Sequence, residues 1–503
     1  MLLPGFEGPN LHAWGVVNSA QAEIQTGSEA MTAQTFGWKS KRVAGMAIGA
    51  IAMLAVAGPA LTDDNGDDNG NGKKDEVFQV TTVIQVTGRT TASPFFSFDI
   101  SWFDPTHKKF FLADRNSKAI DVVDANDLGA GVTQQFAPGF AGVVGGPDTS
   151  GPDGVLTANN DTELWIGDSP GKVWVLDSAS GQKVALPGSP TGNPILVGGT
   201  TRADELCYDP KDNLIMIASP SEGFVSIISS AGTNKGQVLK QIPFGAPATG
   251  IEQCGWSPTT GMFYQNLPGD PPPAGGRDRV AVINSTTMMV DHFINIDIND
   301  CSGLRGMAIG PDNQILLGCN AASPTTGTPR NSIVIDARSG TTANVLKVLT
   351  GQGGVDEVWF NPDDNHYILP SCNTPCRQVP GGPELLFIDD SSGFKLDSSV
   401  KIADQNGVPT PVPPPNPRTV HSAAAGTVGG ETLIFLPIPA VGGTVPQFAP
   451  TLCDTFDDFT RVGDPTSTTG CIVILQAKPD KDDKVAKKGE GDDDSQGDDN
   501  SQH

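Results

Sequence analysis

One apolar pattern recurs seven times along this chain of 503 residues, and it restricts the possible fold more than any other feature. In each copy an apolar strand ends in Asp or a similar polar residue and is followed by a turn. The turn residues are Asp124, Asp177, Ser229, Asn284, Asp336, Asp389 and Gln476, with spacings of 53, 52, 55, 52, 53 and 87 residues. Repeats of about 40 to 55 residues that hold several short strands are typical of β-propeller blades. A β-sandwich is the alternative, but it does not explain so regular a period.

Each copy holds further candidate strands. Along the chain, each copy begins with a strand that reaches an Asp-Pro-like turn (ISWFDP, LCYDP) and continues with a second apolar strand (KFFLAD, LIMIAS). The strand that ends in the Asp-like residue is the third, and a weaker fourth strand follows it (QVLKQIPF). The sequence therefore predicts an all-β, seven-bladed propeller with four-stranded blades over residues 77–477. The seventh copy lacks its last strand, whereas the strand at 77–86 is left over. We expect that strand to complete the last blade and close the ring, which removes an exposed sheet edge.

The 60 Gly and 41 Pro also argue against a helical bundle. On either side of the predicted propeller, residues 61–76 and 478–503 are acidic and poor in apolar residues, so we expect a disordered linker and tail. Residues 67–72 match the first half of an EF-hand loop, but Phe78 occupies the position where its bidentate Glu belongs. A solvated spacer is therefore favoured over a specific calcium loop.

The region 1–60 has the pattern of a secretory signal peptide. Lys39, Lys41 and Arg42 precede an apolar run over 43–57, and small residues follow at 58–60. The run is shorter than the roughly 20 residues of a spanning helix, so we expect export to the periplasm or cell exterior with no stable membrane insertion after cleavage. An uncleaved anchor is the alternative. Met31 is a more ordinary start than Met1.

Eight cysteines lie downstream of this region, which predicts disulfides in an oxidising compartment. The favoured local pairs are Cys301–Cys319, Cys372–Cys376 and Cys453–Cys471. A zinc site is less favoured, because only Cys372 and Cys376 are closely spaced and no His accompanies them.

The repeats resemble those of the YVTN, NHL and SMP-30/gluconolactonase-like propellers, through GPDGVL and LWIGDSPGKVWVLDSASG. The resemblance covers residues 77–476 and implies the propeller fold. It does not decide the function, because this group includes lactonases, esterases, lyases and pure binding proteins. In the lactonases a calcium ion held by carboxylates and Asn polarises the ester carbonyl. This chain matches the carboxylates but departs from that pattern by offering a His and an Arg and no clear Asn.

Aligning the first strands of the copies gives one column of charged residues. Its members are Asp99, Asp153, Asp204, Glu252, Arg305, Asp356 and His421. The first strand of each blade begins at one face of the central channel, so equivalent positions are expected to form a ring. Adjacent carboxylates oppose each other's ionisation unless a cation or proton lies between them. The five acids therefore predict a divalent cation site, and a carboxylate-rich site suits Ca²⁺, with Mg²⁺ or Mn²⁺ as alternatives. A solvated rim that holds ions only loosely is the competing interpretation.

Long connections between the second and third strands of the fourth to seventh copies are expected to lie beside this ring as disulfide-pinned lids, or to be decorative insertions. Arg305 is available for a substrate anion, and His421 is the His placed for proton transfer. These features predict a metal-dependent hydrolase or lyase of a small ester or lactone. The alternative is a non-catalytic exported propeller that binds a protein or polysaccharide. The net charge of −25 argues against nucleic acid as a partner.

Overall fold

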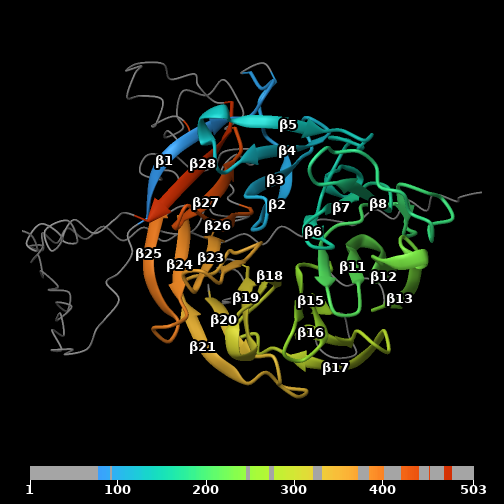
Figure 1. Ribbon diagram of the computed structural model, residues 1–503. Helices are drawn as coiled ribbons and strands as arrows, with labels where there is room; N and C mark the ends of the chain where they lie inside the picture. The colour runs from blue at the N-terminus through green and yellow to red at the C-terminus, as the bar shows by residue number, and fades with distance from the viewer. Residues whose placement is uncertain are drawn as a thin grey trace, which may run out of the picture. The chain divides into compact units, whose positions relative to one another are not determined.

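Seven four-stranded antiparallel sheets are arranged around a common centre in the computed structural model, as the repeat period predicts (Figure 1). The structure describes residues 78–90, 93–244, 250–270, 277–320, 331–371, 384–401, 421–440, 453 and 469–477. The predicted signal region, linker and tail lie outside them. No helix within these ranges is long and apolar enough to cross a membrane.

The strands follow the same order in every blade, from the channel outward. The innermost strands are β2 (Phe98–Asp104), β6 (Val155–Ala158), β10 (Leu206–Asp209), β14 (Cys254–Ser257), β18 (Leu304–Ile309), β22 (Trp359–Asn361) and β26 (Ala424–Val428). The second strands are β3 (Lys109–Asp114), β7 (Glu163–Asp168), β11 (Leu214–Ser219), β15 (Met262–Asp270), β19 (Gln314–Cys319), β23 (His366–Ser371) and β27 (Glu431–Ile438).

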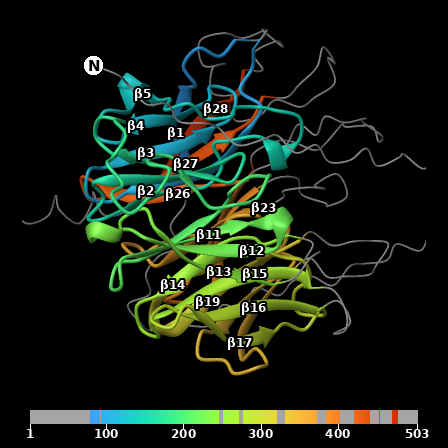
Figure 2. The same ribbon diagram turned by 90° about the vertical axis from the view of Figure 1, so that its right-hand side faces the viewer.

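The outer half of each blade is built in the same way. The third strands are β4 (Ala119–Asp124), β8 (Lys172–Asp177), β12 (Phe224–Ser229), β16 (Arg277–Asn284), β20 (Asn331–Asp336), β24 (Glu384–Asp389) and β28 (Cys471–Ala477). The outermost strands are β5 (Val132–Phe136), β9 (Ile195–Leu196), β13 (Val238–Pro243), β17 (Met289–Asn295), β21 (Val345–Thr350), β25 (Lys395–Lys401) and β1 (Phe78–Gln85). We number the blades 1 to 7 from β2–β5 to β26–β28 with β1. In Figure 2, β15, β16 and β17 of blade 4 follow one another across their sheet.

The N-terminal strand β1 pairs with β28 in antiparallel register, from Phe78 opposite Ala477 to Gln85 opposite Cys471. The last blade thus combines strands from the two ends of the described chain. Short 3-10 helices occupy some connections between strands, at Leu128–Ala130, Pro147–Thr149, Pro220–Glu222, Gly232–Asn234 and Pro311–Asn313.

The recurring Asp at the end of the third strand is a turn residue. Its Oδ1 accepts a hydrogen bond from a backbone N–H two or three residues later, as at Asp124 (2.9 Å to Asn126), Asp177 (2.8 Å to Ser180) and Asp389 (2.8 Å to Ser391). Asp side chains favour such turns because they replace a backbone acceptor. The sequence period therefore reports turn chemistry repeated in each blade.

The apolar core is divided among neighbouring blades. One cluster joins Phe103 and Phe110 of blade 1 to Phe435 and Ile472 of blade 7, all fully or nearly fully buried. Each blade thus buries both faces of its sheet against its neighbours, which accounts for the apolar runs in β7, β11 and β23.

Among the described residues, six cysteines form three disulfides. Cys301–Cys319 and Cys453–Cys471 confirm two of the predicted pairs. The third, Cys207–Cys254, was not predicted; it joins the innermost strands of blades 3 and 4, with a Cα–Cα distance of 5.8 Å. The predicted Cys372–Cys376 pair lies outside the described residues. Disulfides are typical of proteins in oxidising compartments.

Candidate functional site

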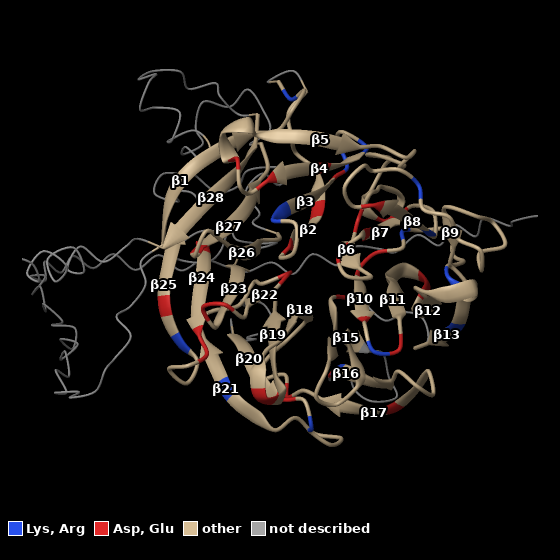
Figure 3. Ribbon diagram, in the orientation of Figure 1, with Lys and Arg blue, Asp and Glu red and all other residues tan. Residues whose placement is uncertain are grey.

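All seven residues of the predicted charged column meet at one end of the channel. They lie at the start of the innermost strands or within three residues before them, so each blade contributes the same position. Figure 3 shows acidic residues close to the centre of the ring near β2, β6, β10 and β22. Ion pairs join them, together with Arg115 and Arg202, into one continuous set that we call the ion-pair network.

Blades 1 to 3 are linked through two arginines. Arg115 lies directly after β3 and donates from Nη2 to Asp99 at 2.5 Å and from Nε to Asp153 at 2.9 Å. Arg202 lies between β9 and β10 and reaches Asp204 at 2.8 Å and Asp99 at 3.6 Å. Because Asp99 belongs to blade 1 and Arg202 lies in the connection that leads into blade 3, this contact joins blades that are not neighbours in the ring. The network therefore spans the channel at this end.

Blades 4 to 7 are linked through His421 and Arg305. His421 places Nε2 2.7 Å from Asp99 and Nδ1 2.6 Å from Asp356. Arg305 reaches Asp356 at 3.0 Å and Glu252 at 3.3 Å. The imidazole thus connects the two halves of the network.

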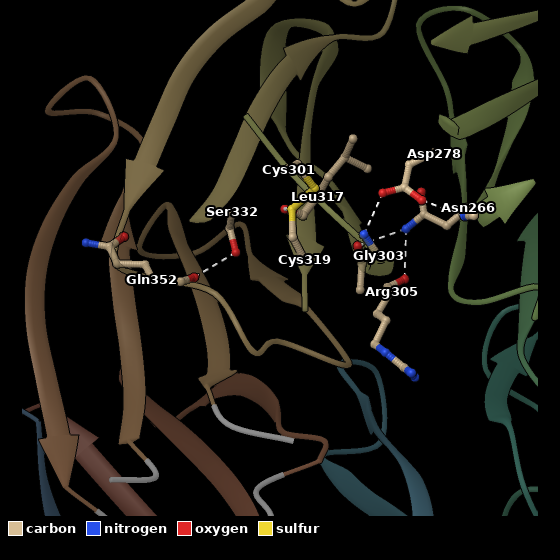
Figure 4. The surroundings of a disulfide bond; sticks show 11 residues. Asn266, Asp278, Cys301, Gly303, Arg305, Leu317, Cys319, Ser332 and Gln352 are labelled. Atoms are coloured by element: carbon tan, nitrogen blue, oxygen red, sulfur yellow. Dashed lines mark hydrogen bonds between the residues drawn. A yellow bond between two sulfur atoms is a disulfide. The ribbon is translucent and has the colours of Figure 1, made fainter. Parts of the chain in front are cut away.

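The backbone around Arg305 is fixed by several contacts (Figure 4). Gly303 donates its backbone N–H to the carboxylate of Asp278, and the side chain of Asn266 donates to the carbonyl of Arg305 at 2.8 Å. The Cys301–Cys319 disulfide joins the segment before β18 to the end of β19. The Arg305 side chain is 33% exposed, the largest fraction among the cations of the network.

Burial and ion pairing move the pKa values of these groups in opposite directions. Burial raises the pKa of Asp99, but Arg115 and His421 outweigh it and bring that pKa well below its ordinary value. Burial raises the pKa of Asp204 to about 7 despite Arg202. Burial lowers the pKa of His421, but Asp356 and Asp99 outweigh it and raise that pKa well above its ordinary value. The imidazole is therefore held as a cation, with both nitrogens facing carboxylates.

This geometry bears on the predicted roles. A protonated imidazole between two carboxylates is a counter-ion and is poorly placed to accept a proton. Asp99, Asp153 and Asp204 offer carboxylate oxygens within 4.8 Å of one another, a donor set that suits a hard cation. Arg115 and Arg202, however, bond to the same carboxylates and place positive charge where an ion would sit. The residues as arranged do not fit a calcium ion, so the calcium site and the catalytic roles stay predictions.

The channel continues beyond the network as a cavity of about 500 Å³. It reaches the opposite face at the exposed turn residues Pro105, Pro210 and Pro362. Its lining includes Trp102, Tyr208, Trp256, Trp359 and Phe360. Trp102 and Trp359 meet edge to face with ring centroids 5.0 Å apart, although they belong to blades 1 and 6. Aromatic side chains thus form much of the wall.

Two acids lie at the inner end of this cavity. Glu205 and Glu357 directly follow Asp204 and Asp356, line the cavity, and are only 5% and 4% exposed. The Oε2 atom of each is buried and has no hydrogen-bond partner. Burial raises the pKa of both carboxyls well above the ordinary value, and the nearby Glu357 carboxylate raises the pKa of Glu205 further. A hydrogen bond between the two side chains opposes the rise for Glu357. Both must extend toward the axis, because they come from opposite sides of the ring.

The column alignment missed four charged residues and the aromatic wall. Arg115 begins the short RNSK connection, and Arg202 lies two residues before Asp204. Glu205 and Glu357 were visible only as the second acid of a repeated Asp-Glu pair. The aromatic residues stand two or three positions before the proline of the Asp-Pro-like turn, in ISWFDP, LCYDP, CGWSP and VWFNP. The long connections predicted as lids, at 268–279, 320–331, 371–384 and 438–470, lie mostly outside the described residues, which include only their ends and Cys453.

The raised pKa of Asp204 gives a prediction on pH. A carboxyl with a higher pKa in the folded state stabilises the fold below its unfolded pKa of 3.8 and loses this contribution as the pH rises through about 7. We therefore expect the wild type to lose stability relative to an Asp204→Asn variant between about pH 4 and pH 8. Urea unfolding of both proteins across this range measures the difference. A difference that stays constant or changes in the opposite direction would contradict the assignment.

No family model and no curated protein sequence matches the chain. Among solved structures, the hydrazine synthase of Kuenenia stuttgartiensis is similar at 14% identity and a TM-score of 0.49, covering 69% of this chain and 94% of that one. A chain of a mitotic checkpoint complex is similar at 11% identity and a TM-score of 0.50, covering 79% and 93%. At such low identity the similarity to the checkpoint-complex chain concerns the fold alone. No conclusion is drawn from the similarity to the hydrazine synthase. The resemblance to the YVTN/NHL/SMP-30 group stays a prediction.

Proposed function

We propose that this protein is an exported propeller that binds a small organic molecule in its central channel. The observation that carries the proposal is the cavity of about 500 Å³, which is walled by aromatic residues and reaches solvent at the turn face. Concave sites of about 300–1,000 Å³ with apolar walls and a few convergent polar groups are typical of small-molecule sites. The ion-pair network spans the other end of the channel, so a ligand enters from the turn face.

Two further features support the proposal. Each carboxylate of the network has a cationic partner, although Asp153 Oδ2 and Arg202 Nε lack hydrogen bonds. The lining of the cavity retains more buried polar atoms without partners. These atoms include Trp256 Nε1 and Trp359 Nε1 as well as the Oε2 atoms of Glu205 and Glu357. The disulfides and the apolar run at 43–57 support export, which places the channel where extracellular or periplasmic molecules reach it.

A screen with small fragments by ligand-observed NMR tests the proposal. The library contains cationic, neutral and anionic aromatic and aliphatic fragments. We expect binders whose signals weaken strongly in a Trp359→Leu variant and persist in Trp174→Leu, because Trp174 lies in β8 and does not line the cavity. Binding that is insensitive to Trp359, or the absence of binders to the folded wild type, would overturn the proposal.

A divalent cation site that serves a hydrolase or lyase is the second candidate, favoured by the close approach of Asp99, Asp153 and Asp204. Metal analysis of the purified protein, with melting curves before and after EDTA, distinguishes the two. Because the arginines already neutralise these carboxylates, we expect EDTA to leave the melting temperature unchanged. A stoichiometric metal whose removal lowers the melting temperature would establish the second candidate.

A further inference from the structure

Acidic residues outnumber basic residues along the channel. The network and the inner end of the cavity hold seven acids: Asp99, Asp153, Asp204, Glu205, Glu252, Asp356 and Glu357. Four basic residues face them: Arg115, Arg202, Arg305 and His421. On the network side each acid forms an ion pair. Among the described residues, neither Glu205 nor Glu357 has a Lys, Arg or His within salt-bridge distance. The unmatched acids are therefore those that line the cavity.

The positions of Glu205 and Glu357 single them out from ordinary acidic clusters. Each is more than nine-tenths buried, lines the cavity, and has an Oε2 atom without a hydrogen-bond partner. Burying a carboxylate without a partner is strongly unfavourable, so such a group is protonated or paired with a cation. The backbone beside Glu357 is held by Gln253 of blade 4, which accepts a hydrogen bond from Val358 N at 3.0 Å and donates to Val358 O at 3.3 Å. The carbonyl of Glu205 accepts a hydrogen bond from Ala218 N at 2.9 Å. A cation that reaches the inner end of the cavity thus meets two fixed carboxyl groups.

The walls of the cavity select the kind of cation. Trp102, Trp256, Trp359 and Tyr208 line the path between the turn face and the two acids. The faces of aromatic rings attract cations, and cages of several rings recognise methylated ammonium groups in particular. A strongly hydrated inorganic cation would lose its water shell against these walls, whereas an alkylated ammonium group carries little bound water. The lining therefore favours an organic cation over a metal ion.

We infer that the ligand of this channel is an organic cation, an ammonium or alkylammonium group that pairs with Glu205 and Glu357 and packs against the aromatic walls. This inference rests on the proposed function, because it names the ligand class of the same site. In this inference the two glutamates make the site prefer a positively charged ligand. The tryptophans contribute affinity for charged and neutral ligands alike.

Choline and its uncharged isostere 3,3-dimethylbutan-1-ol test the inference, because they have nearly the same shape and differ in charge. Isothermal titration calorimetry on the full chain is expected to show binding of choline at least about tenfold tighter than binding of the isostere, a preference equivalent to about 1.4 kcal/mol. A Glu205→Gln, Glu357→Gln double variant is expected to abolish this preference. Glu431→Gln, which removes one charge at an exposed position of β27, is the control and is expected to keep it.

Each outcome separates this inference from the proposed function. Equal binding of the two probes, lost in Trp359→Leu, would overturn the inference and leave the proposed function standing. A choline preference that survives in the double variant would overturn the role of the glutamates. Binding of Ca²⁺ that depends on the same two glutamates, without choline binding, would show an inorganic cation site and overturn the inference. If the double variant does not fold, the single variant Glu205→Gln is compared instead, with the preference expected to fall.

Discussion

Replacing Arg115 by alanine is expected to lower the free energy of unfolding by about 3–5 kcal/mol, because it leaves buried charges without their partner. Arg115 bonds to both Asp99 and Asp153, and its own side chain is only 8% exposed. Urea unfolding followed by circular dichroism measures the change. An Arg115→Lys variant keeps the charge but lacks the planar fork, so an intermediate loss is expected.

Arg338→Ala is the matched control. Arg338 also pairs with an aspartate, Asp336 at 3.2 Å, but its side chain is 64% exposed. Solvent screens such pairs, so the urea midpoint is expected to change little. Similar losses in the Arg115 and Arg338 variants would contradict the view that the network is a buried structural unit.

Replacing Phe435 by alanine is expected to destabilise the protein by about 3–5 kcal/mol, the usual loss for a fully buried aromatic residue. Phe435 lies in β27 and stacks on Phe110 and Phe103 of blade 1, with ring centroids 4.6 Å and 5.7 Å apart. This packing joins the last blade to the first. Thermal and urea unfolding of the variant measure the loss.

Phe96→Ala provides the comparison, because Phe96 lies just before β2 of blade 1 but its side chain is 53% exposed. Its removal is expected to have little effect on either transition. A small effect of Phe435→Ala would mean that the contact between blades 7 and 1 contributes little to stability.

The sequence predicts the blade number and the charged column because both depend on residues repeated in register. Asp124, Asp177 and Asp389 recur since each turn needs the same acceptor. Asp99 and Asp356 recur at equivalent positions since every innermost strand begins at the same face. A period of this kind survives even when the overall sequence similarity between blades is low.

The ion pairs of the network could not be predicted from the sequence. Arg115 follows a second strand and Arg202 precedes an innermost one, so neither falls in the column that collects the acids. Without them the acids suggest a metal, whereas in the fold two arginines also face the same carboxylates. The disulfide Cys207–Cys254 was missed in the same way, because 47 residues separate two cysteines that only the packing of neighbouring blades brings together.

The aromatic wall of the cavity could not be predicted, because aromatic residues are common in β-strands. Trp256 and Trp359 lie in short apolar strands, where an aromatic residue reads as part of a half-buried sheet. Their common direction toward the axis follows only from the closed arrangement of the blades.

A crystal structure of the protein with a small-molecule binder identified by the NMR screen tests the central claim most directly. The account predicts electron density for the ligand inside the channel, between Trp359 and the carboxyl groups of Glu205 and Glu357. Density on the opposite face, against Arg305 and His421, would contradict the account and identify the ion-pair network as the binding site.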